Sequence, residues 1–256
     1  MQVYGHRGAK GVFMENSILG FVSAAKQGAE YFELDIRLSS DNQLIVVHDE
    51  ILRRLADSPL LVSKTPASVL KTIILTGTSE GIPTLEEVIN ACPNIKHWQF
   101  EIKTLETNTN FVQPMSELIE KYCLQDKVTI TSLHRGLLKA FKHALPHIAR
   151  GYVQKSLLPN GIKAARKLGC SMLVLNKNLG KKNYINKAQK KGLHVSMWTV
   201  NNVHLIEKFQ SYGVNSLITD FPHIALNMNI QATKSKYLED LEDLEDLEDL
   251  GNVESK

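Results

Sequence analysis

Hydrophobic and polar positions along the chain follow two alternating periods from the first residue to about Leu226. Short segments with an apolar residue at every second position predict β-strands, and the segments between them, with apolar residues three or four apart, predict helices. The strand pattern occurs in residues 2–4, 31–38, 44–48, 97–103, 128–132, 149–153, 172–175, 194–200 and 216–219.

Start signals mark two of the predicted helices. Asn16 stands where an N-cap for residues 17–27 is expected. Thr84 and Glu87 have the spacing of a capping box, which predicts a helix that begins after Thr84 and ends near Cys92. Most of the predicted strands are separated by such helical segments.

Alternating strands and helices predict an α/β fold with a parallel sheet and helices outside it, here a TIM-type (β/α)8 barrel. No linker divides residues 1–232, so we expect one barrel domain. Nine candidate strands exceed the eight of an ideal barrel. Residues 39–43 are too few for a parallel crossover, so residues 44–48 should run antiparallel to the strand before them and make the barrel irregular there.

Residues 233–256 form a tail of Leu-Glu-Asp repeats with eight acids between Leu238 and Leu250. Leucines at every third position spread around most of a helix circumference and give no single apolar stripe. We therefore expect this low-complexity tail to be disordered and without a catalytic role.

The composition is that of an ordinary soluble enzyme, with 43% hydrophobic residues. No apolar run approaches the length of a membrane span, and no signal peptide is recognisable, so we expect a cytoplasmic protein. Residues 1–233 carry 27 Lys and Arg against 18 Asp and Glu, a net charge of +9, which suits an anionic substrate or simply serves solubility. Three widely spaced cysteines, Cys92, Cys123 and Cys170, are expected to be reduced and mostly buried.

Charged residues alternate with apolar ones in residues 32–38. Glu33 and Asp35 therefore share one face of a strand. If the apolar face packs on the outer helices, both carboxylates face the barrel interior, where they need a neutralising partner. The alternative is a solvent-exposed edge strand, or ion pairs with Arg37.

A second strand repeats this arrangement, because Glu101 and Lys103 share one face of residues 97–103. Three carboxylates from two strands predict a site of hard oxygen ligands for Mg²⁺, Ca²⁺ or Mn²⁺. For Lys103 the alternative is a purely structural ion pair with Glu101.

His6, Arg7 and Gly8 follow the first strand directly, where a barrel places its active-site loops. Arg7 offers a bidentate group for phosphate, and Gly8 permits close backbone approach. A lone histidine in a loop is more often an ordinary surface residue. However, folding residues 44–48 back over the short turn places His48 opposite Leu34, so two histidines are predicted to flank one metal ion and to supply acid–base catalysis.

The sequence resembles the glycerophosphodiester phosphodiesterase family, in particular its short cytoplasmic bacterial members. The resemblance spans almost the whole barrel and lies in motifs whose order and spacing are specific together. The motifs are His6-Arg7-Gly8, Glu15-Asn16-Ser17, Gly28-Ala29-Glu30, Glu33-Leu34-Asp35, Val46-Val47-His48-Asp49, Pro83-Thr84-Leu85-Glu86-Glu87, Glu101-Ile102-Lys103, Trp198-Thr199-Val200-Asn201 and Ile218-Thr219-Asp220.

The resemblance implies a TIM barrel that uses one divalent metal ion to convert glycerophosphodiesters to glycerol 3-phosphate and an alcohol. It implies attack by the glycerol 2-hydroxyl and a cyclic phosphate that water then opens. The implied roles are general base and acid for His6 and His48, metal ligands for Glu33, Asp35 and Glu101, phosphate binding for Arg7 and Lys103, and contact with the glycerol carbons for Trp198, although Trp198 equally suits plain core packing. Asp220 is interpreted as a turn or cap residue.

The chain departs from the family pattern at a few positions. Met14 replaces a usual Pro, Asn42 replaces a turn Gly whose positive φ Asn also tolerates, and Leu133 replaces a common aromatic residue. The long insertion of periplasmic relatives between His48 and Thr84 is missing. None of these changes removes a residue of the implied catalytic set.

Other functions remain open at this point. A lysophospholipase D-type phosphodiesterase would use the same site on a lipid substrate. A metal-dependent barrel isomerase or aldolase would use the histidines to shuttle protons, and an adaptor would act through its acidic tail. We expect a small-molecule partner rather than a nucleic acid, and the sequence sets neither the alcohol group nor the number of subunits.

Overall fold

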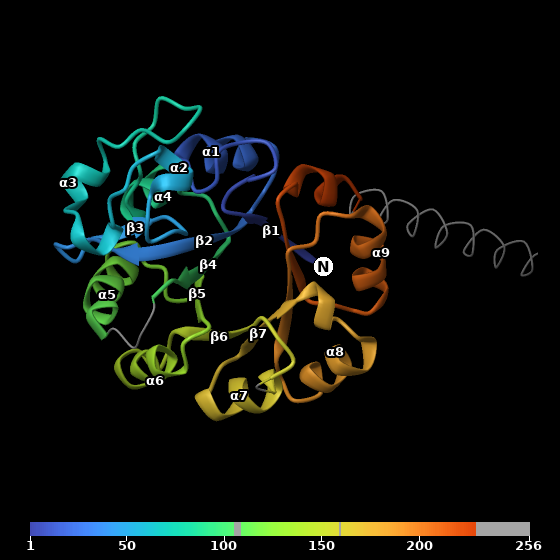
Figure 1. Cartoon of the computed structure of the whole chain (residues 1–256). Helices are drawn as coiled ribbons and strands as arrows, with labels where there is room; N and C mark the ends of the chain where they lie inside the picture. Colours follow the sequence, from blue (N-terminus) through green and yellow to red (C-terminus); the bar gives the residue numbers. More distant parts are fainter. Residues whose placement is uncertain (105–108, 159, 229–256) are drawn as a thin grey trace, which may run out of the picture.

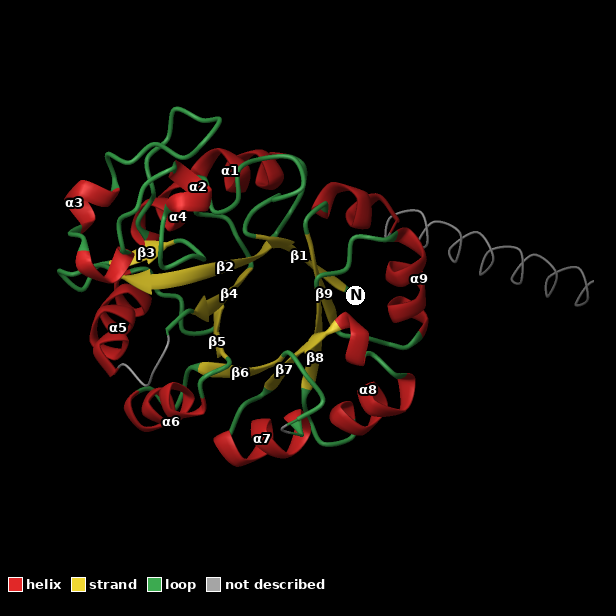
Figure 2. Ribbon diagram, in the orientation of Figure 1, coloured by secondary structure: helices red, strands yellow, loops and turns green. Residues whose placement is uncertain are grey.

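The computed structural model describes residues 1–104, 109–158 and 160–228. The predicted tail, residues 233–256, lies outside this range. Eight parallel strands form a closed barrel in the order β1, β9, β8, β7, β6, β5, β4 and β2, and pairing of β1 with β2 closes it (Figures 1 and 2). The strands are β1 Gln2–His6, β2 Tyr31–Leu38, β3 Leu44–Val46, β4 His97–Ile102, β5 Val128–Ser132, β6 Ala149–Gln154, β7 Met172–Asn176, β8 His194–Trp198 and β9 Ser216–Thr219. The predicted barrel and all nine predicted strands are confirmed.

The irregularity expected beside β2 is present. Strand β3 runs antiparallel to β2 with Ile36 opposite Val46, and it pairs with no other strand of the barrel. Continued by two residues, this register places His48 opposite Leu34. Asn42 in the connecting turn has φ +59°, the conformation predicted for the position where Gly is usual. The turn thus returns the chain to the carboxylate-bearing part of β2.

Helices cover the outside of the barrel (Figure 2). They are α1 Ile18–Lys26, α2 Arg53–Ala56, α3 Ala67–Leu70, α4 Leu85–Ala91, α5 Val112–Lys121, α6 Arg135–Ala144, α7 Gly161–Leu168, α8 Lys182–Gln189 and α9 Val203–Ser211, with short 3-10 turns η1 Val62–Lys64, η2 Thr109–Phe111 and η3 Lys177–Leu179. The capping box of Thr84 and Glu87 opens α4 as predicted. The prediction that Asn16 caps α1 is wrong: Ser17 is the N-cap, and its side chain accepts the N–H of Gly20.

The apolar faces of β2 and β4 pack against the outer helices. Phe32, Phe100 and Trp98 are essentially inaccessible, and Phe21 of α1 stacks edge-on against Phe32. The opposite faces of the same strands are therefore free to carry charge into the barrel. No helix in the described ranges is long and apolar enough to cross a bilayer.

Two of the three cysteines match their prediction. Cys92 and Cys170 are buried, and burial raises the pKa of each thiol to about 11. Cys123 is exposed, so the expectation of mostly buried cysteines is met by two of the three. It lies just after α5 with a positive φ of 51°, so its side chain belongs to a surface turn rather than to the core.

Candidate functional site

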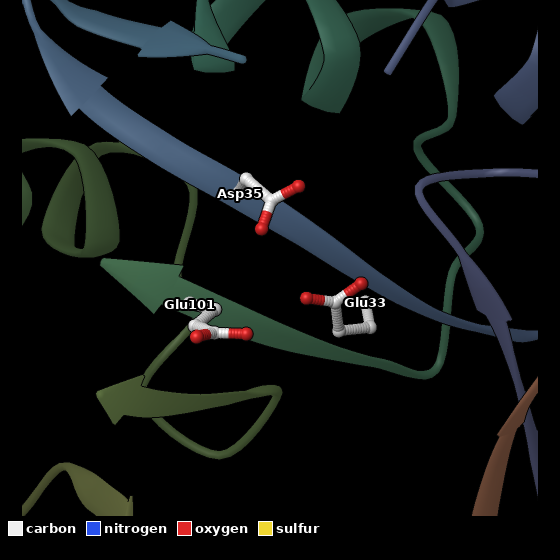
Figure 3. A group of neighbouring side chains, drawn as sticks. All are labelled: Glu33, Asp35 and Glu101. Atoms are coloured by element: carbon white, nitrogen blue, oxygen red, sulfur yellow. The ribbon is translucent and has the colours of Figure 1, made fainter. Parts of the chain in front are cut away.

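Three carboxylates meet on two neighbouring strands. Glu33 and Asp35 project from β2 and Glu101 from β4, where Asp35 and Glu101 are register partners (Figure 3). One oxygen from each residue lies within 4.8 Å of the others. The alternation of apolar and charged positions thus places all three groups on the interior face, as predicted.

The cluster has the electrostatics of a cation site. Glu33 Oε2 and Asp35 Oδ1 are buried and accept no hydrogen bond from the described residues. Burial, with the negative charges of Asp35 and Glu101, raises the pKa of Glu33 well above its ordinary value. Burial opposes ionisation of Asp35 too, but Lys103 and Arg7 outweigh it and hold that pKa below its usual range. Such a set of hard oxygen donors fits a divalent ion.

His6 ends β1 and lies beside this cluster. Its Nε2 is 3.8 Å from Glu33 Oε2, and its Nδ1 is 2.5 Å from Asp220 Oδ1. Asp220 is itself fixed by the amide of Asn201, which donates to Oδ2 at 2.6 Å. Burial lowers the pKa of His6, and the hydrogen bond that its ring donates to Asp220 counteracts part of this effect. One nitrogen of the ring is therefore anchored, and the other faces the carboxylates.

His48 lies near Asp35, close enough for a positive charge on its ring to lower the pKa of that carboxyl. Its Nδ1 is 2.6 Å from Asp49 Oδ1. Arg37 holds the backbone here, since its Nε donates to the carbonyl oxygen of His48 at 2.7 Å and its Nη1 donates to Glu50. Each histidine thus has one ring nitrogen bound to an aspartate.

Arg7 and Lys103 bring positive charge to the cluster. Arg7 Nε is 2.8 Å from Asp35 Oδ2, and Lys103 Nζ is 2.5 Å from Glu101 Oε1 and 3.3 Å from Asp35 Oδ1. Although burial opposes it, these carboxylates raise the pKa of both side chains. Lys103 therefore makes the ion pair with Glu101 that was its structural alternative, and it also reaches Asp35.

Ion pairs connect the two histidine-bearing loops. Arg7 Nη1 donates to Glu15 Oε1 at 2.7 Å, and Arg54 Nη2 donates to the same oxygen at 2.7 Å. Arg54 Nε also donates to Asp49 Oδ2 at 2.7 Å, and Asp49 holds His48. Because Arg54 bridges the two acids, the loop after β1 and the loop after β3 are held in one arrangement.

Trp198 lies at the carboxyl end of β8, on the same end of the barrel. Its indole packs against a small cluster that includes Tyr4, Val174 and Ile218. The indole Nε1 is buried and has no hydrogen-bond partner among the described residues. Trp198 thus packs in the barrel interior, as its alternative interpretation expected. Its unpaired N–H leaves a polar atom available to a ligand.

Sequence reasoning missed three side chains that support the site. Asp220 was interpreted as a turn residue, but it binds His6 across 214 positions. Asn16, expected to be a cap, donates from Nδ2 to Asp35 Oδ2 at 3.1 Å. Arg37 was assigned no role except as a partner of the acids. One signal was available: Asp220 follows β9 directly, and β9 neighbours β1 in a closed barrel.

A cavity of about 410 Å³ opens next to Lys103. It lies over the carboxyl ends of β2 and β4, and its lining is mostly polar. The lining includes Arg37, Asn42, Glu50, Ser63, Lys103 and Phe111.

Three carboxylates, two histidines and two cationic side chains lie together in a closed parallel barrel. This arrangement is typical of the active site of a barrel enzyme. Residues 6–224 match the model of the glycerophosphoryl diester phosphodiesterase family. The chain therefore belongs to that family, as its motifs indicate.

Individual relatives cover from 46% to 89% of the chain. A glycerophosphodiester phosphodiesterase of Bacillus altitudinis is 26% identical over 242 residues, which are 89% of this chain and 97% of the relative. Human lysophospholipase D GDPD1 is 30% identical over 129 residues, 46% of this chain and 40% of the relative. A solved Oleispira antarctica phosphodiesterase in complex with the product sn-glycerol-3-phosphate has a TM-score of 0.83 and 25% identity, covering 89% of this chain and 96% of its own.

Proposed function

We propose that the chain hydrolyses glycerophosphodiesters to sn-glycerol 3-phosphate and an alcohol. The observation that carries this proposal is the group of three buried carboxylates with two aspartate-anchored histidines and two cationic side chains around it. The named Bacillus relative and the product complex of the Oleispira enzyme support the same chemistry. They favour phosphodiester cleavage over the isomerase or aldolase alternative.

Glu33, Asp35 and Glu101 are the residues that would hold one divalent ion, Mg²⁺, Ca²⁺ or Mn²⁺. When bound, such an ion polarises a phosphoryl oxygen and lowers the energy of the charge that develops there. The unpartnered Oε2 of Glu33 supports this assignment, because a buried carboxylate oxygen without a donor is costly unless a cation neutralises it.

Arg7 and Lys103 are proposed to bind the non-bridging phosphate oxygens. Both already lie at the edge of the carboxylate cluster, and both carry their charge throughout the physiological range. A guanidinium presents parallel donors to phosphate, and an ammonium acts as a compact point charge. Together they offset the negative charge that a diester brings to an acidic site.

His6 is proposed as the general base and His48 as the general acid. The proton of the glycerol 2-hydroxyl passes to Nε2 of His6 as that oxygen bonds to phosphorus. The bond from phosphorus to the alcohol oxygen breaks, and His48 protonates the departing oxygen. Water then opens the cyclic phosphate, giving its proton to His48 while His6 returns a proton to the 2-oxygen.

Roles for Trp198 and for the cavity beside Lys103 are proposed from their positions relative to the cluster. Trp198 is proposed to pack on the glycerol carbons, with its unpaired Nε1 toward a glycerol oxygen. The cavity beside Lys103 is proposed to receive the alcohol group, because it adjoins the phosphate-binding lysine. Its polar lining suits an alcohol that carries hydroxyl groups of its own.

The test is release of glycerol 3-phosphate, measured with a coupled assay over diesters of choline, ethanolamine, glycerol and inositol. We expect turnover of at least one diester, loss of turnover with a chelator, and recovery when divalent ion is added back. Sugar turnover without phosphate ester cleavage would contradict the proposal.

A second candidate is a lysophospholipase D-type activity on diesters that keep one acyl chain. The observation that favours it is the pair Leu157 and Leu158, which are 75% and 82% exposed in the loop after β6 at the mouth of the barrel. The human relative with the name lysophospholipase D is consistent with this activity. Comparing rates on a glycerophosphodiester and on its acylated form with the same alcohol separates the two candidates.

A further inference from the structure

One stretch of the chain contains no acidic residue. Residues 127–206 carry 15 Lys and Arg and not one Asp or Glu, whereas residues 1–126 carry 11 Lys and Arg and 16 Asp and Glu. The first part therefore has a net charge of −5 and the second of +15. A run of 80 residues without an acid in an ordinary globular composition concentrates positive charge on one side of the barrel.

This stretch forms a continuous part of the barrel, from β5 through β8 with α6, α7 and α8 on its outside (Figure 1). Within the described ranges, none of its Lys or Arg side chains is ion-paired with a carboxylate; the pairs that the structure records for Lys and Arg all involve residues before it. Arg150 is buried among backbone carbonyls. The rest of the charge is therefore unbalanced by neighbouring acids.

Exposed leucines stand at the mouth of this same half. Leu133 follows β5 and is 41% exposed, and Leu157 and Leu158 follow the neighbouring strand β6. Exposed cations lie around them at the same end, where strands end and helices begin: Arg135, Lys155, Lys163, Lys181 and Lys182. Leu157 and Leu158, at 75% and 82%, are more exposed than any other large apolar side chain in the described part of the chain.

Hydrogen bonds hold the leucine-bearing loop in place. The Tyr184 hydroxyl of α8 donates to Gln154 Oε1 at 2.9 Å, and Gln154 Nε2 donates to the carbonyl of Ser156 at 3.0 Å. Ser156 Oγ donates to the carbonyl of Leu158 at 2.7 Å. These bonds connect the turn that carries the two leucines to α8 through Gln154.

We propose that this half of the barrel mouth docks on the surface of an anionic lipid membrane, with Leu157 and Leu158 entering the interface and the surrounding lysines binding lipid phosphates. Apolar side chains flanked by Lys and Arg are the chemistry that an anionic lipid surface recognises. Nucleic acid would match the charge but gives no use for protruding leucines.

Docking in this orientation turns the catalytic end of the barrel toward the lipid. All parallel strands of the barrel end on the same side, so the carboxylate cluster and the leucine loop face the same direction. A diester that resides in or leaves a membrane would then meet the site without crossing to the far side of the protein. The surface charge acts independently of the chemistry at the cluster.

The experiment is sedimentation of the full chain with vesicles of phosphatidylglycerol and phosphatidylcholine in equal amounts, and with vesicles of phosphatidylcholine alone. We expect binding to the anionic vesicles that weakens as salt rises, and little binding to the neutral ones. Each cation near an anionic surface strengthens binding about fivefold, so the triple variant Lys155→Glu, Lys163→Glu and Lys181→Glu should bind at least about tenfold more weakly.

A matched variant changes the same charge at the opposite end of the same half. Lys142→Glu, Lys167→Glu and Lys190→Glu alter exposed residues near the carboxyl ends of α6, α7 and α8, away from the mouth. This variant should lose less than about threefold. Equal losses in the two variants would show attraction by net charge alone and would overturn the proposed orientation.

The leucines are tested separately by the double variant Leu157→Ser with Leu158→Ser, which should weaken vesicle binding at least about fivefold. RNA serves as a second polyanion that has no apolar interface, and any binding to it should be the same in this variant as in the wild type. All three variants should retain the wild-type rate on glycerophosphocholine. Absence of binding to anionic vesicles, or binding to RNA that survives competition by those vesicles, would overturn the proposal. Vesicle binding by a chain that cleaves no diester would leave the docking proposal intact and refute the proposed function alone.

Discussion

The two halves of this barrel share one architecture but carry different side chains. Residues 1–126 supply β1, β2, β3 and β4 and, with them, seven of the eight candidate site residues, while residues 127–206 supply β5 to β8 and only Trp198. The first half has 16 acids and the second has none. A fold of repeated strand–helix units can therefore concentrate its chemistry on a few adjacent strands and leave the others to close the barrel and to present a surface.

The difference also shows why the acids gather where they do. Buried carboxylates are tolerated in the first half because they face Arg7, Lys103 and the two histidines at close range. The second half fills its interior with uncharged groups such as Val153, Val174 and Ser196. Charge is thus concentrated at one site inside the barrel and spread over the outside of the other half.

The largest expected effect is a loss of turnover when the histidines of the first half are removed. His6→Ala and His48→Ala should each lower turnover of a glycerophosphodiester at least about a hundredfold, because each removes one proton transfer, and such transfers contribute about 10² to 10⁴ in rate. The measurement is the coupled glycerol 3-phosphate assay, with thermal unfolding to show that the variants remain folded.

The matched control lies in the basic half. His134 also follows a barrel strand, β5, but no described contact joins it to the carboxylates, so His134→Ala should keep turnover within about threefold of wild type. Near-normal turnover of either His6→Ala or His48→Ala would remove that histidine from the mechanism. A large loss of turnover in His134→Ala would show that the second half of the barrel also takes part in catalysis.

A smaller effect is expected at Asp220, which anchors His6. Asp220→Asn retains the side-chain shape but removes the charge that holds Nδ1, so we expect about a tenfold to hundredfold fall in kcat with little change in KM. Steady-state kinetics with one diester give both constants. A rise in KM with unchanged kcat would mean that Asp220 positions substrate rather than the imidazole.

The smallest effect concerns stability and is shared by both halves. Burial lowers the pKa of His97 in β4 and of His194 in β8 to about 4, and at His97 the nearby ring of His194 contributes to the shift, because two protonated rings would repel each other. Both rings are neutral in the folded protein. Below about pH 6.5 the unfolded chain binds protons that the folded chain refuses, so stability is full above that pH and falls as the pH drops toward 4.

Urea unfolding at neutral pH and at pH 5.5 measures the first part of this loss, which should be about 1.4 kcal/mol for each ring. The double variant His97→Asn and His194→Asn should be less stable at neutral pH but show a flatter dependence. An unchanged slope in that variant would assign the acid sensitivity to other groups.

Much of the fold was predictable from local pattern. Strict alternation in residues 31–38 predicted β2 over its full length and placed Glu33 and Asp35 on one face. The short link after it predicted an antiparallel β3 and the position of His48, because five residues cannot make a parallel crossover. These predictions depend on neighbouring residues only, and for that reason they were correct.

The unpredicted features depend on closure of the barrel. Asp220 reaches His6 only because β9 pairs with β1, and no local pattern distinguishes it from a turn residue. Asn16 is of a residue type that often caps helices. Its backbone instead has a positive φ of 59°, its amide donates to Asp35, and Ser17 caps the helix. Partners in a closed sheet are set by tertiary contacts that sequence spacing does not contain.

The central claim is that Glu33, Asp35 and Glu101 hold one divalent ion. Binding of Mn²⁺, followed by electron paramagnetic resonance of the free ion, tests it without reference to turnover. We predict one tightly bound Mn²⁺ per chain in the wild type, its loss in Glu33→Gln with Asp35→Asn, and full retention in the surface variant Glu117→Gln. Equal Mn²⁺ binding by the wild type and the Glu33→Gln, Asp35→Asn variant would contradict the account.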